Sequence, residues 1–61
     1  MVTCEDIGRL VWANDSIGEL VRITSIPAGE GRRYETAVVS FDDGRSEQVF
    51  PIAKVLSMRE G

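Results

Sequence analysis

The chain has 61 residues, 43% hydrophobic and 28% charged, and its seven Lys and Arg against ten Asp and Glu give a net charge of −3. This length allows one domain, residues 1–61, which buries only about 60% of the surface of its unfolded chain and usually needs a disulfide, a metal or self-association for support. Cys4 is the only cysteine and histidine is absent, which excludes an internal disulfide and a Cys/His zinc site. Self-association or a very efficient core is therefore expected.

Charge and hydropathy also limit the kinds of partner and the cellular compartment that we expect. Proteins that bind nucleic acid usually carry a basic excess, so this acidic chain disfavours such a partner except at a local Arg cluster. No stretch approaches the roughly 18 apolar residues of a membrane span. The acidic start, residues 1–6, differs from a signal peptide and is expected to be flexible. We expect a cytoplasmic protein, because one unpaired cysteine suits a reducing compartment.

Hydrophobic spacing predicts short strands along the first half of the chain. The first covers residues 8–13 and ends at a turn over 14–16, whose Asn, Asp and Ser side chains bond their own backbone. The second covers residues 18–26 and is rich in β-branched residues. Residues 27–31, with one Pro and two Gly, are expected to form a flexible loop.

The strongest strand signal covers residues 34–41, where alternation separates two faces. One face carries Ala37, Val39 and Phe41, the last expected in the core, and the other carries Tyr34, Thr36, Val38 and Ser40.

Turn signals divide the remainder of the chain. Asp42-Asp43-Gly44 predicts a hairpin because glycine accepts a positive φ, and a return strand over 46–50 ends at Pro51. A helical turn over 52–55 and a last strand over 56–58 follow, with a helix over 51–60 as the second choice. Five short strands with one helical turn before the last predict an all-β, small closed barrel.

Gly8 with Val11, Gly18 with Val21, the run Val39-Ser40-Phe41-Asp42-Asp43-Gly44 and the late Leu56 form an ordered pattern. It resembles SH3-like and Tudor-like small barrels, in particular the Tudor-like domain at the C-terminus of some bacterial superfamily 1 DNA helicases. The resemblance implies a five-stranded SH3-like small barrel with one short helical turn before the last strand. It also implies a module that docks protein or nucleic acid.

The run Glu47-Gln48-Val49-Phe50-Pro51-Ile52-Ala53 resembles a second family. The pore motif of the plasmid-type (type II) dihydrofolate reductases reads Val-Gln-Ile-Tyr, followed by Pro, an aliphatic residue and Ala. Phe50 here replaces the tyrosine, Glu47 replaces an apolar residue, and Ala13 falls where the family has its pore lysine. The resemblance implies a homotetramer that binds NADPH and dihydrofolate in one shared pore, with Gln48 and Val49 contacting the ligands.

The aromatic residues are candidates for partner binding. If Val11 faces the core, alternation sends Trp12 outward, and if Val49 faces the core, Phe50 points outward as well. Trp12, Tyr34 and Phe50 would then line a peptide groove or a cage for a cationic side chain. Large aromatic residues are highly buried on average, which favours the core for Trp12. For Phe50, core, ligand groove and self-association surface all stay open.

Charged residues give weaker signals. Arg32 and Arg33 lie beside two glycines and form a possible anion contact, but they lack P-loop spacing, and a solvated hairpin tip is the favoured interpretation. Hairpin chemistry explains Asp42 and Asp43, because adjacent turn carboxylates seldom occupy a pocket that shifts their pKa. Cys4 has no histidine to activate it. No catalytic residue, metal or cofactor is therefore assigned.

Two main classes of function follow. The leading hypothesis is a small non-catalytic interaction module that docks a protein partner through a barrel groove or strand edge. Its acidity favours a basic protein surface over nucleic acid. The alternative is an enzyme similar to the type II dihydrofolate reductases, active only as a homo-oligomer and using NADPH. A structural subunit whose exposed apolar positions are buried by a partner is a third possibility.

Overall fold

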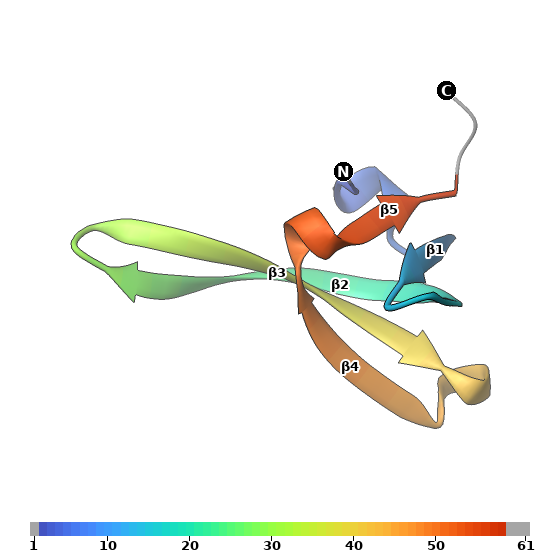
Figure 1. The fold of residues 1–61 in the computed structure, drawn as a ribbon. Helices are drawn as coiled ribbons and strands as arrows, with labels where there is room; N and C mark the ends of the chain where they lie inside the picture. Colours follow the sequence, from blue (N-terminus) through green and yellow to red (C-terminus); the bar gives the residue numbers. More distant parts are fainter. Residues whose placement is uncertain (1, 59–61) are drawn as a thin grey trace.

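Residues 2–58 form an all-β fold in the computed structural model (Figure 1). The strands are β1 (Leu10–Ala13), β2 (Ser16–Gly29), β3 (Arg32–Phe41), β4 (Ser46–Pro51) and β5 (Val55–Ser57). The 3-10 turns are η1 (Cys4–Asp6), η2 (Asp42–Gly44) and η3 (Ile52–Lys54). All strands belong to one antiparallel sheet. The predicted all-β class, with five strands and a short helical turn before the last one, is confirmed.

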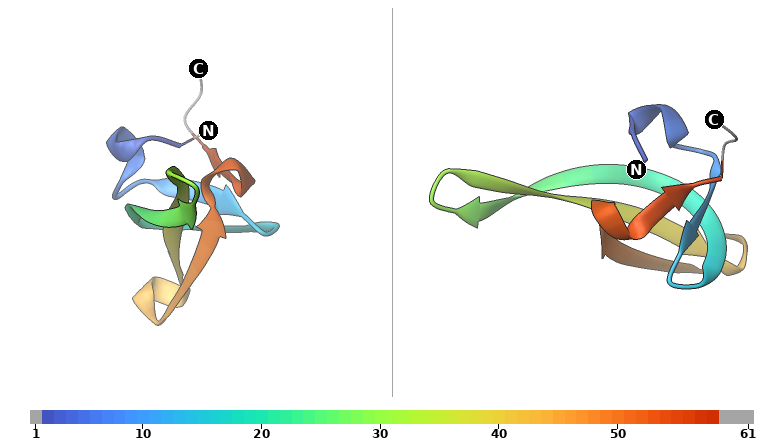
Figure 2. Two further views of the ribbon diagram at one scale, coloured as in Figure 1. Left: turned by 90° about the vertical axis from the view of Figure 1, so that its left-hand side faces the viewer. Right: turned by 45° about the horizontal axis from the view of Figure 1, so that its top comes forward.

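The sheet is strongly curved because its two edge strands are joined by a short link. The strand order is β4-β3-β2-β1-β5, so β4 and β5 lie at opposite edges, yet only η3 separates them in sequence. The edges of a flat five-stranded sheet would lie about 19 Å apart. Three residues of 3-10 helix rise only about 6 Å. The sheet therefore coils on itself, as Figures 1 and 2 show.

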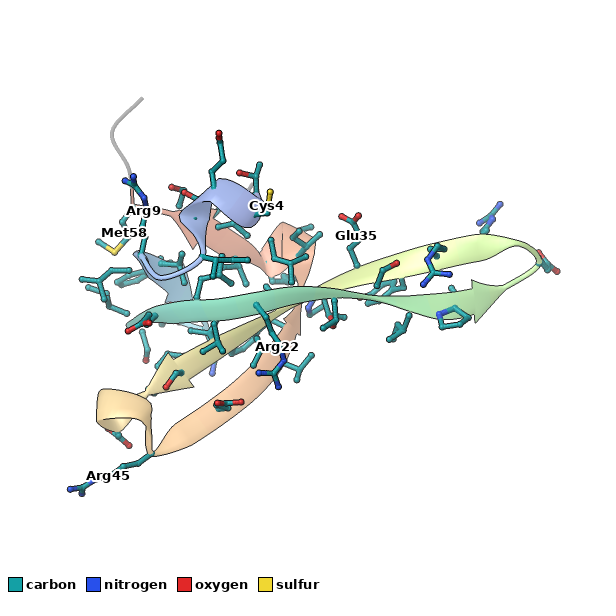
Figure 3. The ribbon with its side chains drawn as sticks, turned by 180° about the vertical axis from the view of Figure 1, so that it is seen from behind. Cys4, Arg9, Arg22, Glu35, Arg45 and Met58 are labelled. Carbon is teal, nitrogen blue, oxygen red and sulfur yellow. The ribbon has the colours of Figure 1, made fainter. Side chains whose placement is uncertain are left out.

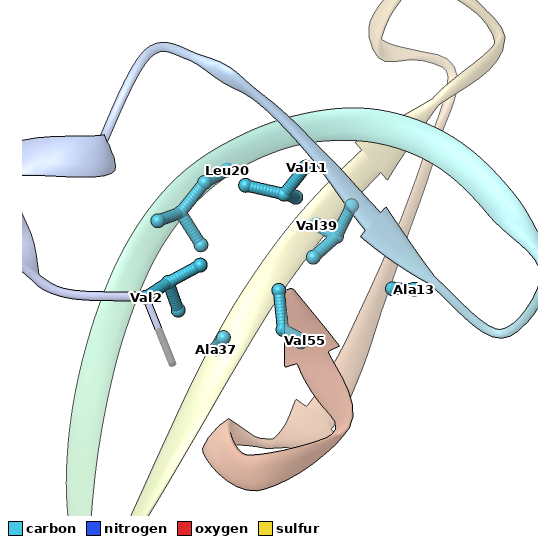
Figure 4. Close-up of a cluster of buried hydrophobic side chains, with 7 residues drawn as sticks. All are labelled: Val2, Val11, Ala13, Leu20, Ala37, Val39 and Val55. Carbon is cyan, nitrogen blue, oxygen red and sulfur yellow. The ribbon is translucent and has the colours of Figure 1, made fainter. Parts of the chain in front are cut away.

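The side chains inside the curved sheet are mostly small. The buried cluster consists of Val2, Val11, Ala13, Leu20, Ala37, Val39 and Val55 (Figure 4). Ile23, Phe41, Phe50 and Ile52 pack against this cluster and are only partly buried. Phe41, predicted in the core, therefore lies at its border.

Strand β2 bends so that it can pair with two different neighbours (Figure 2). Its first residues pair with β1 and the rest pair with β3, and the register shifts between Leu20 and Arg22 as in a β-bulge. Gly18 makes the close approach possible. A Cβ atom there would lie 2.6 Å from Val39 Cγ1 and 2.7 Å from the carbonyl oxygen of Ser40.

The β1–β2 connection confirms the turn predicted there. The β2–β3 connection is shorter than the loop predicted there. Asn14 and Asp15 both have positive φ, which suits a two-residue hairpin turn. Residues 27–31 were predicted as a flexible loop, but β2 continues to Gly29 and only Glu30 and Gly31 form the turn. Pro27 is tolerated because the pairing register shifts immediately after it, leaving an extra residue in the strand.

The β2–β3 hairpin projects from the body of the molecule (Figure 1). Every residue from 25 to 35 is exposed. Arg33 stabilises the base of this segment, since its Nε donates to Ser25 Oγ at 2.7 Å and its Nη2 donates to the Ser25 carbonyl oxygen at 3.1 Å. This segment is the projecting hairpin.

The N-terminal segment, expected to be flexible, packs against the last strand. Thr3 caps η1, with its backbone N–H donating to Asp6 Oδ2 at 2.9 Å. Asp6 is fully buried, and its Oδ1 accepts a hydrogen bond from Ser57 Oγ at 3.3 Å. Val2 joins the core. Residues 2–6 and β5 therefore hold each other in place.

Candidate docking surface

Three large apolar side chains form a row across the outer side of β2, β1 and β5. Trp12 on β1 pairs with Ile17 on β2 and with Leu56 on β5. Side chains directly opposite on neighbouring antiparallel strands lie about 5 Å apart. Trp12 is 39% exposed, Ile17 50% and Leu56 53%.

A second pair of apolar side chains extends this row. Leu10 lies two residues before Trp12 on β1, so it falls on the same side of the sheet. Met58 directly follows β5 and lines a groove together with Leu10. Leu10 is 60% exposed and Met58 45%. The five side chains Leu10, Trp12, Ile17, Leu56 and Met58 are called the outer apolar face below.

Alternation along the strands creates this face. Val11 and Ala13 on β1, and Val55 on β5, point into the core and are fully buried. Their sequence neighbours must therefore point outward. The small residues of β1 and β5 lie inside and the large ones lie outside, which reverses the arrangement usual for a core.

Charged groups border the outer apolar face at the end where Leu10 lies. Glu19 pairs with Leu10 across β1 and β2. Arg9, Leu10, Ser57 and Met58 line a shallow groove of about 300 Å³ on the other side. Figure 3 shows Arg9 and Met58 side by side. Opposite charges thus flank the face on its two sides.

Trp12 and Phe50 occupy positions different from those favoured by the sequence. Trp12 was favoured for the core, but it lies outside because Val11 is the buried residue of the pair. Phe50 packs against the core and meets the Phe41 ring edge-on, with ring centroids 6.2 Å apart. An outward Phe50 was expected only if Val49 faced the core, but Val49 is 63% exposed.

The predicted groove of three aromatics does not form. Tyr34 pairs with Ile26 on the projecting hairpin, whereas Trp12 pairs with Ile17 near the start of β2. Ile17 and Ile26 are nine residues apart on one strand, which is about 30 Å of extended chain. Phe50 lies on the inner side of the sheet. The three aromatics therefore do not share a surface.

The remaining predicted site residues lie on two other surfaces. Gln48 on β4 contributes to a groove of about 390 Å³, together with Asn14, Ser16, Ile17, Phe41, Asp42 and Ser46. Tyr34 and Arg33 line a separate groove of about 520 Å³ beside Pro51, Ile52 and Ala53. Arg32 and Arg33 are exposed on the projecting hairpin, and the guanidinium of Arg33 already bonds to Ser25.

The face of β3 that carries Val38 is also partly covered. Val38 is only 3% exposed and lies between Arg22 on β2 and Val49 on β4. Arg22 extends toward β4, where its Nη2 lies 3.5 Å from Glu47 Oε1 (Figure 3). The aliphatic stem of an arginine can cover apolar surface in this way. Arg22 and Glu47 therefore cover part of this face, while Val49 on the same face stays exposed.

Sequence reasoning missed Leu10, Ile17, Leu56 and Met58 as surface residues. The alternation of Leu10 and Trp12 with Val11 and Ala13 was a signal for part of the face. The rest depended on the strand register, which brings Ile17 and Leu56 to Trp12 from segments far apart in sequence.

Among residues 2–58, no three or more Cys, Asp or Glu side chains gather as a metal site would need. Cys4 is a free, exposed thiol. No helix in the described part of the chain has the length and apolar character needed to cross a membrane.

The comparisons with known proteins found no relatives. The chain matches no protein-family model, no curated protein and no solved structure at a level that would establish a relationship.

Proposed function

We propose that this chain is a small non-catalytic interaction module that docks a protein partner through the outer apolar face. The observation that carries the proposal is the placement of Trp12, Ile17 and Leu56 in register on one exposed surface. Contiguous apolar patches with a polar rim are typical of protein-binding sites. Glu19 and Arg9 supply such a rim.

Trp12 is the expected anchor of this interface. It lies in the middle of the row, with Ile17 on one side and Leu56 on the other. Tryptophan near the centre of an interface often contributes more binding energy than the residues around it. A partner should therefore present an apolar pocket or face to Trp12, bordered by polar groups.

An SH3-like barrel is the finer fold that we propose. The strand order, the strong curvature and the 3-10 turn between β4 and β5 support it. Docking of another macromolecule, which the Tudor-like resemblance implies, agrees with the proposed function. The net charge of −3 favours a protein over a nucleic acid as that partner. The cytoplasmic location stays a prediction.

The reductase-like alternative uses a different surface and can be tested separately. It requires Gln48 and Val49 to meet NADPH and dihydrofolate, and both residues are exposed on β4, at the sheet edge opposite β5. We expect no NADPH binding by fluorescence titration. Gln48→Ala should leave the fold and the docking through the outer apolar face unchanged. NADPH binding that Gln48→Ala abolishes would instead establish the enzyme.

Site-specific photocrosslinking in cells tests the docking proposal. A photoreactive amino acid at position 17 lies on the outer apolar face, and the same group at position 35 lies on the projecting hairpin as the matched control. We expect discrete protein adducts from position 17 and none of the same mass from position 35. Adducts absent from position 17, or identical at the two positions, would contradict the proposal.

A further inference from the structure

The outer apolar face has the size of one partner's share of a stable interface. Its five side chains are 39% to 60% exposed. At roughly 200 Å² for a large side chain, they present on the order of 500 Å² of apolar surface. A standard interface takes about 800 Å² from each partner, of which somewhat more than half is apolar. The face therefore supplies the apolar part of one complete interface.

The charges that border the face are arranged for contact with a copy of itself. Glu19 lies on the β2 side of Leu10, and Arg9, whose backbone bonds to Leu20, lines the groove that Leu10 shares with Ser57 and Met58 at the end of β5. A two-fold axis parallel to β1 exchanges these two sides between copies. Glu19 of one copy then meets Arg9 of the other. An interface of this isologous kind needs such self-complementarity.

The same symmetry also matches the apolar side chains. With the axis along β1, Trp12 of one copy meets Trp12 of the other, and Ile17 meets Leu56. Ile17 and Leu56 are similar in size, and each is about half exposed. The charged and the apolar contacts therefore agree on one arrangement.

The composition of the core also favours a second copy of the chain as the partner. The fully buried interior is built mainly from Val and Ala, while larger residues of β1 and β5 remain outside. A 61-residue domain with so small a core commonly gains stability by oligomerising.

We propose that two copies of this chain pack face to face through the outer apolar face, about a two-fold axis parallel to β1. The inference rests on the proposed function and names the protein partner as a second copy of the chain. The two sheets stack, and the centre of the interface is Trp12.

The wild-type chain provides the first test without any substitution. Trp12 is the only tryptophan and lies at the centre of the proposed interface. Light scattering should give twice the monomer mass at about 100 μM, and dilution to about 1 μM should shift the Trp12 emission to longer wavelength. A monomer mass and a constant emission maximum across this range would overturn the proposal.

Two matched aspartate variants test the face itself. Leu56→Asp places a charge on the outer apolar face, and Val49→Asp places one on the opposite edge strand, where the side chain is at least as exposed. We expect Leu56→Asp to weaken self-association by about tenfold or more, because an unpaired charge would be buried. Val49→Asp should leave it unchanged. Equal dissociation constants for the two variants would overturn the proposal, with circular dichroism showing that each is folded.

Charge reversal tests the two-fold arrangement. Glu19→Arg alone places two cations together and should weaken association a few-fold, whereas Arg9→Glu with Glu19→Arg should restore it. A double variant no tighter than the single one would overturn this arrangement. A chain that stays monomeric yet forms adducts with another protein from position 17 would refute self-association and leave the proposed function standing.

Discussion

At the scale of single residues, Gly18 is fixed by its surroundings more tightly than any other glycine in the described residues. The atom nearest to an added Cβ is Val39 Cγ1, and the next is the Ser40 carbonyl oxygen, a backbone atom that cannot move aside without disturbing β3. The residue is required where β2 bends over its neighbour, because a strand glycine permits such an approach.

Gly18→Ala should therefore destabilise the fold by about 1–3 kcal/mol through overpacking. Urea unfolding followed by circular dichroism measures the loss. Ser16→Ala, at an exposed position at the start of the same strand, is the control and should stay within about 0.5 kcal/mol of wild type. An alanine variant as stable as wild type would contradict the close contact.

Asp6 is the second residue with a clear structural task. Its carboxylate accepts from the Thr3 backbone N–H and from Ser57 Oγ while fully buried. Asp6→Ala should cost about 1–3 kcal/mol, because the Thr3 N–H and the Ser57 hydroxyl lose the buried carboxylate as their acceptor. Hydrogen exchange should accelerate in both η1 and β5. Glu5→Ala, on the exposed side of η1, should change neither, and acceleration confined to η1 would show that the link to β5 is unimportant.

At the scale of elements, the projecting hairpin is separate from the core. The exposed stretch 25–35 contributes nothing to the buried cluster. Arg33→Ala removes both hydrogen bonds to Ser25 but leaves the core intact. We expect faster hydrogen exchange in the hairpin and a change of less than about 1 kcal/mol in the free energy of unfolding, since the bonds are exposed. A larger global loss would show that the hairpin belongs to the cooperative unit.

Most elements could be predicted from the sequence, because their signals are local. The turn at Asn14 and Asp15 depends on residues that accept positive φ, and the strand over 34–41 depends on a strong hydrophobic pattern. Pro27 misled the prediction because a proline normally ends a strand. Here a shift in pairing register accommodates it.

The sides of Trp12 and Phe50 could not be predicted with the same certainty. Val49 and Phe50 are adjacent apolar residues, so alternation gives two faces without saying which one is buried. Pairing decides the matter, since Phe50 lies opposite the buried Ala37. The outer apolar face depends on pairing in the same way, because Ile17, Trp12 and Leu56 come from three separate segments.

At the scale of the whole molecule, the small core and the large outer apolar face predict that stability depends on protein concentration. A partner that binds only the folded chain raises its apparent stability by mass action. If that partner is a second copy, the midpoint of thermal unfolding should rise between about 5 μM and about 200 μM chain. Leu56→Asp should unfold at the same temperature at both concentrations. A wild-type midpoint independent of concentration would argue against the dimer.

The contact between residues 2–6 and β5 has a further consequence for the connectivity of the fold. Asp6 and Ser57 are 51 positions apart in sequence and within hydrogen-bonding distance in space. A short linker from Met58 to Val2 would therefore close the chain into a ring. The exposed turn at Glu30 and Gly31 lies outside the core and provides a place to reopen that ring. The molecule thus has the geometry of a domain that tolerates circular permutation, with its new termini at the tip of the projecting hairpin.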